Sequence, residues 1–422
     1  MKSGKADCGL QYAVKRSGSA VGYCALSIKC GTRDEAGYHC GIAHFVEHTI
    51  FKGTTHRSAS VINSYLDKLG GELNAFTTKE EIVFHATVLK EDLPKAAALL
   101  FELATCATFP EHEIQTEKGV VIDEIHSYKD TPSEDIYDRF EEMIFKGHPL
   151  SGNILGTTVS VKKITREELL KFTKEKFQPC RMAFSIVADI DEAKMEKDVL
   201  KLAGKYFGTE STECPAKQEC SARTDAPHHC GNYSKPSAEQ FEKTISKRNH
   251  QANCVIGGLA PSLYEERERL ATVLLCNILG GPGMNSRLNV ELREKRGLVY
   301  SVESSLNLMS DCGLMTVYFG CDPDDSSRCV EIVSRQLHEI ATHLLTARQL
   351  QAAKQQYLGQ LVVASDNNEQ MALNSARSIL HYGRVAPSSE VRDRILALTA
   401  DDLLAAAAQI VPSRCSRLTL SQ

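Results

Sequence analysis

The sequence has no long apolar run, no low-complexity tract and no excess of positive charge. No segment of the 422 residues is apolar over enough length to span a bilayer, so we expect no membrane insertion. The formal net charge of −5 gives no general attraction to nucleic acid or to anionic membranes. The opening residues 1–8 lack the apolar run of a secretory signal and are a poor transit peptide, so we expect a cytoplasmic protein.

The 15 cysteines are an odd number scattered along the chain, which argues against a disulfide framework in a protein of this size. Free thiols in a reducing compartment are the simplest account. The cysteines in apolar settings are Cys24, Cys30, Cys106, Cys276 and Cys321. One cluster could be a second metal site: Cys214, Cys220, His228, His229 and Cys230. Its spacing matches no standard zinc knuckle, and its segment is rich in Ser, Pro, Thr and Lys, so we favour a flexible linker.

The length predicts two or three domains, and a hydrophobic content of 42% is enough for sizeable cores. Between about residues 208 and 237 the chain lacks apolar periodicity, so we predict domains over 1–210 and 239–422 joined by a linker over 211–238. Strand-like and helical patterns alternate on both sides of this linker. The predicted strands cover 23–28, 82–88, 182–187, 253–258, 300–306 and 313–319. The predicted helices cover 94–107, 133–145, 166–177, 265–279, 326–345 and a stretch from 347 onward.

The segment 44–48 reads His-Phe-Val-Glu-His, a zinc hydrolase motif in inverted order. On a helix His44 and His48 share one face and can bind one zinc ion. Glu47 projects from the same side and can take a proton from a water held by the metal. Ile42, Phe45 and Ile50 give this helix an apolar side, and Gly53 is a plausible stop. The alternative is that both histidines are solvated or satisfied in the core.

A catalytic zinc usually has a third protein ligand. The segment 117–126 reads as a helix in which Glu117 and Glu124 are two turns apart and share a face. One of them could bind zinc while the other holds a ligand or a water. An exposed acidic helix face is the alternative, and spacing alone does not decide between them.

With these residues in place, the chain resembles the pitrilysin-like, or inverzincin (M16), zinc metallopeptidases, and in particular the short members related to mitochondrial processing peptidase. In that family a glutamate about 76 residues after the second histidine is the third ligand, and here 124 − 48 = 76. The resemblance covers nearly the whole chain. The matching flanks are Gly31-Thr32-Arg33-Asp34-Glu35, Phe51-Lys52-Gly53-Thr54, Gly70-Gly71, Asn74-Ala75-Phe76-Thr77, His148-Pro149-Leu150 and Leu155-Gly156-Thr157.

The resemblance implies an α+β fold of two related α/β-sandwich domains, each a mostly antiparallel sheet packed with helices, of the pitrilysin/LuxS-like metallohydrolase type. It implies one zinc ion per chain, bound by His44, His48 and Glu124, with Glu117 supporting the site. It also implies that Arg293 and Tyr300, seven residues apart, contact the substrate. Arg296 lies close enough in sequence to leave the choice of arginine open. By composition this segment reads equally as a charged helix end followed by a strand.

The strand 73–78, with Asn74, Ala75 and Phe76, would be a sheet edge to which an extended peptide adds, or else an ordinary hairpin arm. The resemblance therefore implies a zinc endopeptidase that cleaves short or unfolded polypeptides through a zinc-bound water activated by Glu47. The alternative is a non-catalytic, peptide-binding partner subunit of a processing peptidase-type complex. Such partners typically have broken metal motifs, whereas every element of the motif is intact in this chain. We therefore favour the enzyme, working as a homodimer around a chamber.

Overall fold

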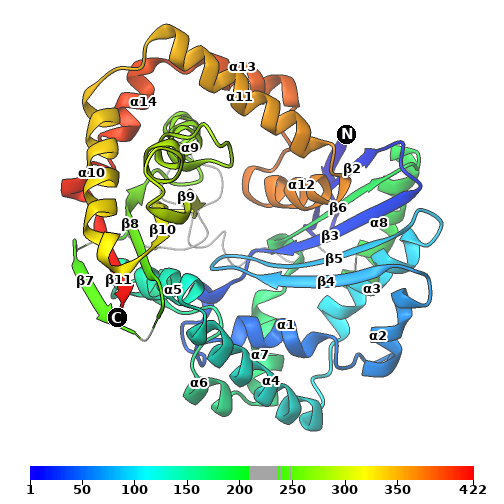
Figure 1. Cartoon of the computed structure of the whole chain (residues 1–422). Helices are drawn as coiled ribbons and strands as arrows, with labels where there is room; N and C mark the ends of the chain where they lie inside the picture. Colours follow the sequence, from blue (N-terminus) through cyan, green and yellow to red (C-terminus); the bar gives the residue numbers. More distant parts are fainter. Residues whose placement is uncertain (209–234, 238, 248) are drawn as a thin grey trace. The chain divides into compact units, whose positions relative to one another are not determined.

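The computed structural model describes residues 1–208, 235–237, 239–247 and 249–422, and these form two compact units (Figure 1). Unit 1 contains Met1–Ile125, Gly152–Asn232 (described up to position 208) and Val363–Ala386. Unit 2 contains His126–Ser151, Tyr233–Val362 (described from position 235) and Pro387–Gln422. Each unit has its own sheet and its own core.

The sheet of unit 1 has six strands in the order β1-β2-β6-β3-β5-β4. The central strands β3 and β6 are almost wholly buried and rich in Val, Ile, Phe and Ala, which suits strands covered on both faces. The pair β2–β6 is parallel and the other pairs are antiparallel. The strands are β1 (Lys2–Lys5), β2 (Gln11–Arg16), β3 (Val21–Ile28), β4 (Glu72–Thr77), β5 (Ile82–Leu89) and β6 (Met182–Ala188).

Helices cover both faces of this sheet. On β6, Phe184 packs against Phe101 of α3, whereas the next residue, Ser185, donates a hydrogen bond to the Ala372 carbonyl of α12 at 2.6 Å. Because successive side chains of a strand point to opposite faces, α3 and α12 lie on opposite sides of the sheet. The helices of this unit are α1 (Ile42–Ile50), α2 (Ala59–Asp67), α3 (Leu93–Cys106), α4 (Glu111–Asp130, as far as Ile125), α6 (Thr158–Lys163), α7 (Arg166–Lys176), α8 (Glu192–Phe207) and α12 (Asn368–Tyr382).

The sheet of unit 2 has five strands in the order β7-β11-β8-β10-β9. Again one pair, β7–β11, is parallel and the others are antiparallel. Its strands are β7 (Glu242–Ser246), β8 (Ala252–Ala260), β9 (Val299–Leu308), β10 (Gly313–Cys321) and β11 (Ser416–Ser421). Its helices are α5 (Pro132–Ile144), α9 (Glu266–Gly280), α10 (Ser326–Thr342), α11 (Ala347–Ser365, as far as Val362), α13 (Ser388–Ala397) and α14 (Ala400–Ala407).

The two sheets repeat one topology. Strands β2 to β6 and strands β7 to β11 follow the same chain order, the same neighbour order and the same pattern of parallel and antiparallel pairs. The predicted fold class, two related α+β domains with a mostly antiparallel sheet packed with helices in each, is therefore confirmed.

Two helices are exchanged between the halves of the chain. Helix α5 comes from the N-terminal half but packs on β8 and β11 of unit 2, and α12 comes from the C-terminal half but packs on β3, β6 and β2 of unit 1 (Figure 1). The predicted domains, 1–210 and 239–422, are continuous stretches of sequence, and they stay a prediction. The linker predicted over 211–238 stays a prediction too, and most of it lies outside the described residues.

None of the helices in the described part of the chain is long and apolar enough to cross a membrane. The described cysteines are all free thiols, and most are buried. Cys106, which we expected in an apolar setting, is partly exposed. The cluster of Cys214, Cys220, His228, His229 and Cys230 lies outside the described residues.

Candidate metal centre and active site

His44, His48 and Glu124 converge in unit 1. Their ligand atoms all lie within 4.8 Å of one another, and no other such group of His, Cys, Asp or Glu occurs in the described part of the chain. The Oε2 atom of Glu124 lies 3.3 Å from His48 Nε2 and 3.7 Å from His44 Nε2. Two ligands of a tetrahedral zinc, each about 2.1 Å from the metal, are about 3.4 Å apart. The two distances from Glu124 are therefore close to those expected around a zinc ion, and the three side chains suit a zinc site.

The chain places the two histidines through the start of α1. Gly41 precedes the helix in a left-handed conformation (φ 89°), which favours glycine. A Cβ at Gly41 would lie 2.8 Å from the Leu155 carbonyl oxygen, so the backbones meet directly there. The buried Glu35 carboxylate accepts hydrogen bonds from the amides of Gly41 (2.9 Å) and Ala43 (3.0 Å). Burial raises the pKa of Glu35 to about 8, although both amides act to lower it.

The electrostatics suit a cation at this position. Burial, together with the charge of His48, lowers the pKa of His44, so its imidazole is neutral and able to bind a metal. Burial acts to lower the pKa of His48 as well, but hydrogen bonds to Glu124 and Glu117 outweigh it and raise the value. The His48 hydrogen bond lowers the pKa of Glu124, which therefore stays ionised. A metal ion bound to His48 Nε2 would require that nitrogen to carry no proton, so metal binding competes with protonation of the ring.

Glu47 lies between the metal ligands and the sheet edge. Its Oε2 accepts a hydrogen bond of 2.5 Å from Thr77 Oγ1, at the end of β4. Burial raises the pKa of Glu47, and the Thr77 hydrogen bond offsets part of this shift. A raised carboxyl pKa favours a group that both accepts and returns a proton near neutral pH.

Glu117 lies beside the three candidate ligands and is not one of them. Its Oε2 is 3.2 Å from His48 Nδ1, the ring nitrogen that faces away from Glu124, and its Oε1 is 2.6 Å from Lys52 Nζ. This geometry matches the predicted division of the pair, with Glu124 as ligand and Glu117 behind His48. The roles themselves stay predictions.

The strand β4 is the edge of its sheet and, among the described strands, pairs with β5 alone. It carries Asn74, Ala75 and Phe76, of which Asn74 and Phe76 are exposed. No strand of the described residues pairs with its outer edge, and Thr77 at its end donates a hydrogen bond to Glu47. The predicted peptide-binding edge is thus placed beside the predicted base.

Arg293 and Tyr300 belong to unit 2. Arg293 lies in a π-helical segment (Asn289–Glu294), a feature common near functional sites. Tyr300 begins the exposed side of β9 and donates a hydrogen bond to Asp322 Oδ1 at 2.9 Å, which raises the pKa of the phenol. The phenol therefore stays protonated at neutral pH and can donate a hydrogen bond. The assignment of both residues as substrate contacts stays a prediction.

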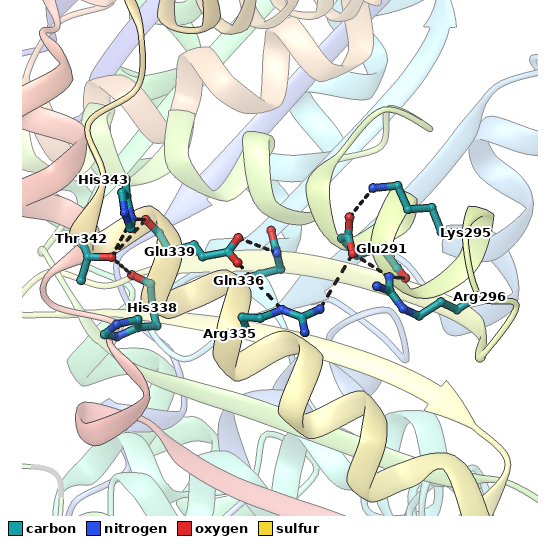
Figure 2. Close-up of polar contacts among 9 residues, drawn as sticks. All are labelled: Glu291, Lys295, Arg296, Arg335, Gln336, His338, Glu339, Thr342 and His343. Carbon is teal, nitrogen blue, oxygen red and sulfur yellow. Dashed lines mark hydrogen bonds and ion pairs between the residues drawn. The ribbon is translucent and has the colours of Figure 1, made fainter.

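The alternative arginine, Arg296, is engaged elsewhere. Figure 2 shows Glu291 between two basic side chains: Arg296 Nη1 at 2.6 Å and Lys295 Nζ at 2.6 Å, with Arg335 of α10 at 4.0 Å. Arg293 is exposed and has no ion pair among the described residues. This contrast favours Arg293 over Arg296 as the arginine available to a substrate.

Sequence reasoning assigned no role to Glu35, Lys52 or Thr77, although each lies in a flank that matched the family. Their partners are far away in the chain or depend on helix geometry, and pattern reasoning does not pair such residues. The signal that could have singled them out is their chemistry: an acid before the helix, a base after it and a hydroxyl at the end of the edge strand.

Comparison with known proteins agrees with this geometry. The sequence model of "Insulinase (Peptidase family M16)" matches residues 12–158, which include all the candidate metal ligands, and that of "Peptidase M16 inactive domain" matches residues 163–357. The chain belongs to peptidase family M16. This M16 chain is 32% identical to an uncharacterized zinc protease of Streptomyces coelicolor over 92% of its own length and 82% of the relative's. It is 30% identical to the uncharacterized zinc protease YmxG of Bacillus subtilis, over 84% of its length and 81% of the relative's.

Solved structures show the same fold. A protease from Helicobacter pylori superposes on the whole M16 chain with a TM-score of 0.86 at 20% identity, and 99% of that chain is covered. A structure from Pseudomonas fluorescens described as a peptidase M16 inactive domain gives a TM-score of 0.85 at 18% identity, covering all of this chain and 97% of the other. The zinc protease relatives support a metal-dependent peptidase in general terms.

Proposed function

We propose that this M16 chain is a zinc endopeptidase that hydrolyses peptide bonds in short or unfolded polypeptides. The observation that supports it best is the convergence of His44, His48 and Glu124 beside Glu47, which is hydrogen-bonded to the edge strand. A zinc ion held by these three ligands would supply a Lewis acid that polarises a carbonyl and makes water more acidic.

Glu47 is the proposed base. It would accept a proton from the water that attacks the scissile carbonyl and return it to the leaving amine. Burial raises its pKa, which suits a group that must be ionised before the attack and protonated after it. Thr77 holds one carboxylate oxygen, so the other is available to the water.

The edge strand β4 would bind the substrate as an added strand, through main-chain hydrogen bonds to the segment with Asn74, Ala75 and Phe76. Main-chain recognition requires an extended peptide and places few demands on its side chains. Short or unfolded chains therefore fit this mode, and folded proteins do not.

We further propose a homodimer and a reducing, cytoplasmic location. The free thiols of the described cysteines support the location. Support for the dimer is the presence of all predicted catalytic residues in one chain, which requires no different partner. Light scattering tests the dimer, and a fully active monomer at high dilution would refute it.

The experiment that tests the enzyme is a zinc analysis combined with cleavage of internally quenched peptides. We expect about one zinc per chain, cleavage at internal bonds, loss of activity with a chelator and recovery with added zinc. Peptide binding without cleavage by the zinc-loaded protein would instead identify the non-catalytic partner subunit.

A further inference from the structure

A lysine lies behind the proposed metal centre and is not explained by the ligands or the base. Lys52 Nζ lies 2.6 Å from Glu117 Oε1, and the other oxygen of the same carboxylate lies 3.2 Å from His48 Nδ1. The Glu117 side chain is 7% exposed, whereas those of Lys52 and His48 are 23% and 22% exposed. A nearly buried carboxylate thus has one oxygen on the lysine and one on the histidine.

The two histidine rings are held in different ways. The His44 side chain is 8% exposed, and its Nδ1 has no hydrogen-bond partner in the described part of the chain, so packing fixes this ring. The His48 side chain is more exposed and lies in the last turn of α1. Its two nitrogens contact Glu117 on one side and Glu124 on the other.

Lys52 reaches Glu117 because of the way α1 ends. The helix stops at Ile50 with Phe51 as its C-cap, and the Lys52 amide donates a hydrogen bond to the Thr49 carbonyl at 3.1 Å. This turn directs the lysine back toward α4. The lysine contacts no metal ligand in any described ion pair or hydrogen bond, so it can act on the centre only through Glu117.

We propose that Lys52 is a positioning residue of the metal centre: it fixes the Glu117 carboxylate, which in turn orients His48 with Nε2 toward Glu124. The inference rests on the proposed function, because it assumes that His44, His48 and Glu124 bind zinc. A partner behind a metal-binding histidine fixes the ring orientation and commonly changes metal affinity about 10–100-fold when it is removed. Here the lysine is one contact further out.

The test is zinc affinity, measured on the full chain by competition with a chromogenic chelator. We expect Lys52→Met to raise the zinc dissociation constant roughly tenfold, at the lower end of such effects. Lys52→Arg should keep most of the affinity, because a guanidinium also donates to a carboxylate. The matched control is Lys95→Met. It removes an exposed lysine of α3 whose Nζ lies 2.7 Å from Asp92 Oδ1, and it should leave zinc affinity unchanged.

Two further measurements separate positioning from general stability. The zinc-free Lys52→Met protein should still unfold in one cooperative transition, at a lowered temperature because the nearly buried Glu117 carboxylate loses its partner, and zinc affinity is measured well below that transition. Glu117→Gln should weaken zinc binding, and adding Lys52→Met to it should weaken binding no further, because the two residues act in series. Wild-type zinc affinity in Lys52→Met, or effects that add in the double variant, would overturn the inference while leaving the proposed enzyme intact. Failure of the wild-type chain to bind zinc would overturn both.

Discussion

The two units share a topology but differ where a helix meets the edge strand. In unit 1, α1 meets β4 through Glu47 and Thr77, two polar side chains 2.5 Å apart beside the metal ligands. In unit 2, α9 meets β9 through Cys276 and Ser304, with the Ser304 hydroxyl donating to the Cys276 carbonyl at 2.6 Å. A Cβ on Gly280 would lie 2.6 Å from the Ser304 amide nitrogen. The backbones therefore meet directly at the second junction, and no group of metal-ligating side chains lies there among the described residues.

The helix before each exchanged helix differs as well. Helix α4, which precedes α5, brings Glu117 and Glu124 to the histidines. Helix α11, which precedes α12, buries Lys354, whose ammonium donates to the carbonyls of Leu396 (2.7 Å) and Leu398 (2.5 Å). The same framework thus carries carboxylates in one unit and a satisfied lysine in the other. The chemistry belongs to the side chains and not to the topology.

The largest effect should come from the carboxylate that faces both histidines. Glu124→Ala removes a ligand, so we expect loss of bound zinc and of peptide cleavage. Glu117→Ala should weaken zinc binding less, by about 10–100-fold. Elemental analysis after dialysis measures both, with Lys354→Met in unit 2 as the control that keeps its zinc. Retention of zinc by Glu124→Ala together with its loss from Glu117→Ala would reverse the assignment within the pair.

Next in size is the base. Glu47→Gln keeps the hydrogen bond to Thr77 but cannot accept a proton, so turnover should fall about 10²–10⁴-fold while zinc stays bound. The corresponding change in unit 2, Cys276→Ala, should leave turnover near that of the wild type. Quenched-peptide assays on both variants test the contrast, and near-normal cleavage by Glu47→Gln would rule out Glu47 as the general base.

The predicted contribution of unit 2 to catalysis is tested by its exposed phenol. Tyr300→Phe should lower kcat by up to about 10²–10³-fold, the usual cost of one donor to a developing oxyanion, with no change in zinc content. Arg293→Ala should impair cleavage more than Arg296→Ala, because Arg296 is already paired with Glu291. The opposite order of the two arginine variants would transfer the assignment to Arg296.

The polar contacts that hold the two exchanged helices to their sheets should differ in how much they stabilise the fold. Helix α12 contacts the buried Glu81, whose carboxylate lies 2.8 Å from His381 Nε2 and 3.0 Å from Arg377 Nε. Helix α5 contacts β9 through Tyr137, whose hydroxyl donates a hydrogen bond to Glu303 at 2.9 Å. Glu81→Ala should cost roughly 3–5 kcal/mol of unfolding free energy, and Tyr137→Phe about 0.5–1.5 kcal/mol. Denaturant titration measures both, and equal costs would contradict the comparison.

The smallest effect is the pH dependence of the stability contributed by the contacts of Glu81 with α12. Burial acts to raise the pKa of Glu81, but His381, Arg377 and Ser27 outweigh it and lower the value. Since the folded pKa lies below the unfolded one of about 4.3, this contribution to stability is full above that pH and is lost as pH falls through the folded value. Melting curves in acid should therefore show the wild type converging toward Glu81→Gln as pH falls. A gap of constant size would exclude this account.

Much of unit 1's site was predictable because its signals are local or come with a fixed spacing. The helix with His44 and His48 is where the apolar pattern placed it, although it ends at Ile50 and not at the predicted stop near Gly53. The edge strand with Asn74 was also predicted, as β4 shows. The helix predicted over 326–345 ends at Thr342, because His343 is extended.

Other features depend on contacts that no local pattern encodes. The strands β2, β7 and β11 were not predicted; β7 is short and mostly exposed, and it pairs in parallel with a strand about 170 residues away. The pattern over 133–145 predicted a helix correctly but gave no indication of the sheet that α5 covers. The ties of Glu47 to Thr77 and of Glu117 to Lys52 likewise appear only when distant segments are brought together.

The exchange of α5 and α12 has a consequence for how the chain is made. The sheet of unit 1 is complete once β6 has been synthesised, but one of its faces, which includes Ala13 and Ala183, is covered by Ile379 and Leu380 from α12. A nascent chain therefore carries an uncovered apolar face for nearly 200 residues of further translation, a period in which such surfaces are prone to aggregate. The half of the chain that bears the metal ligands cannot finish folding before the half that lacks them has been translated.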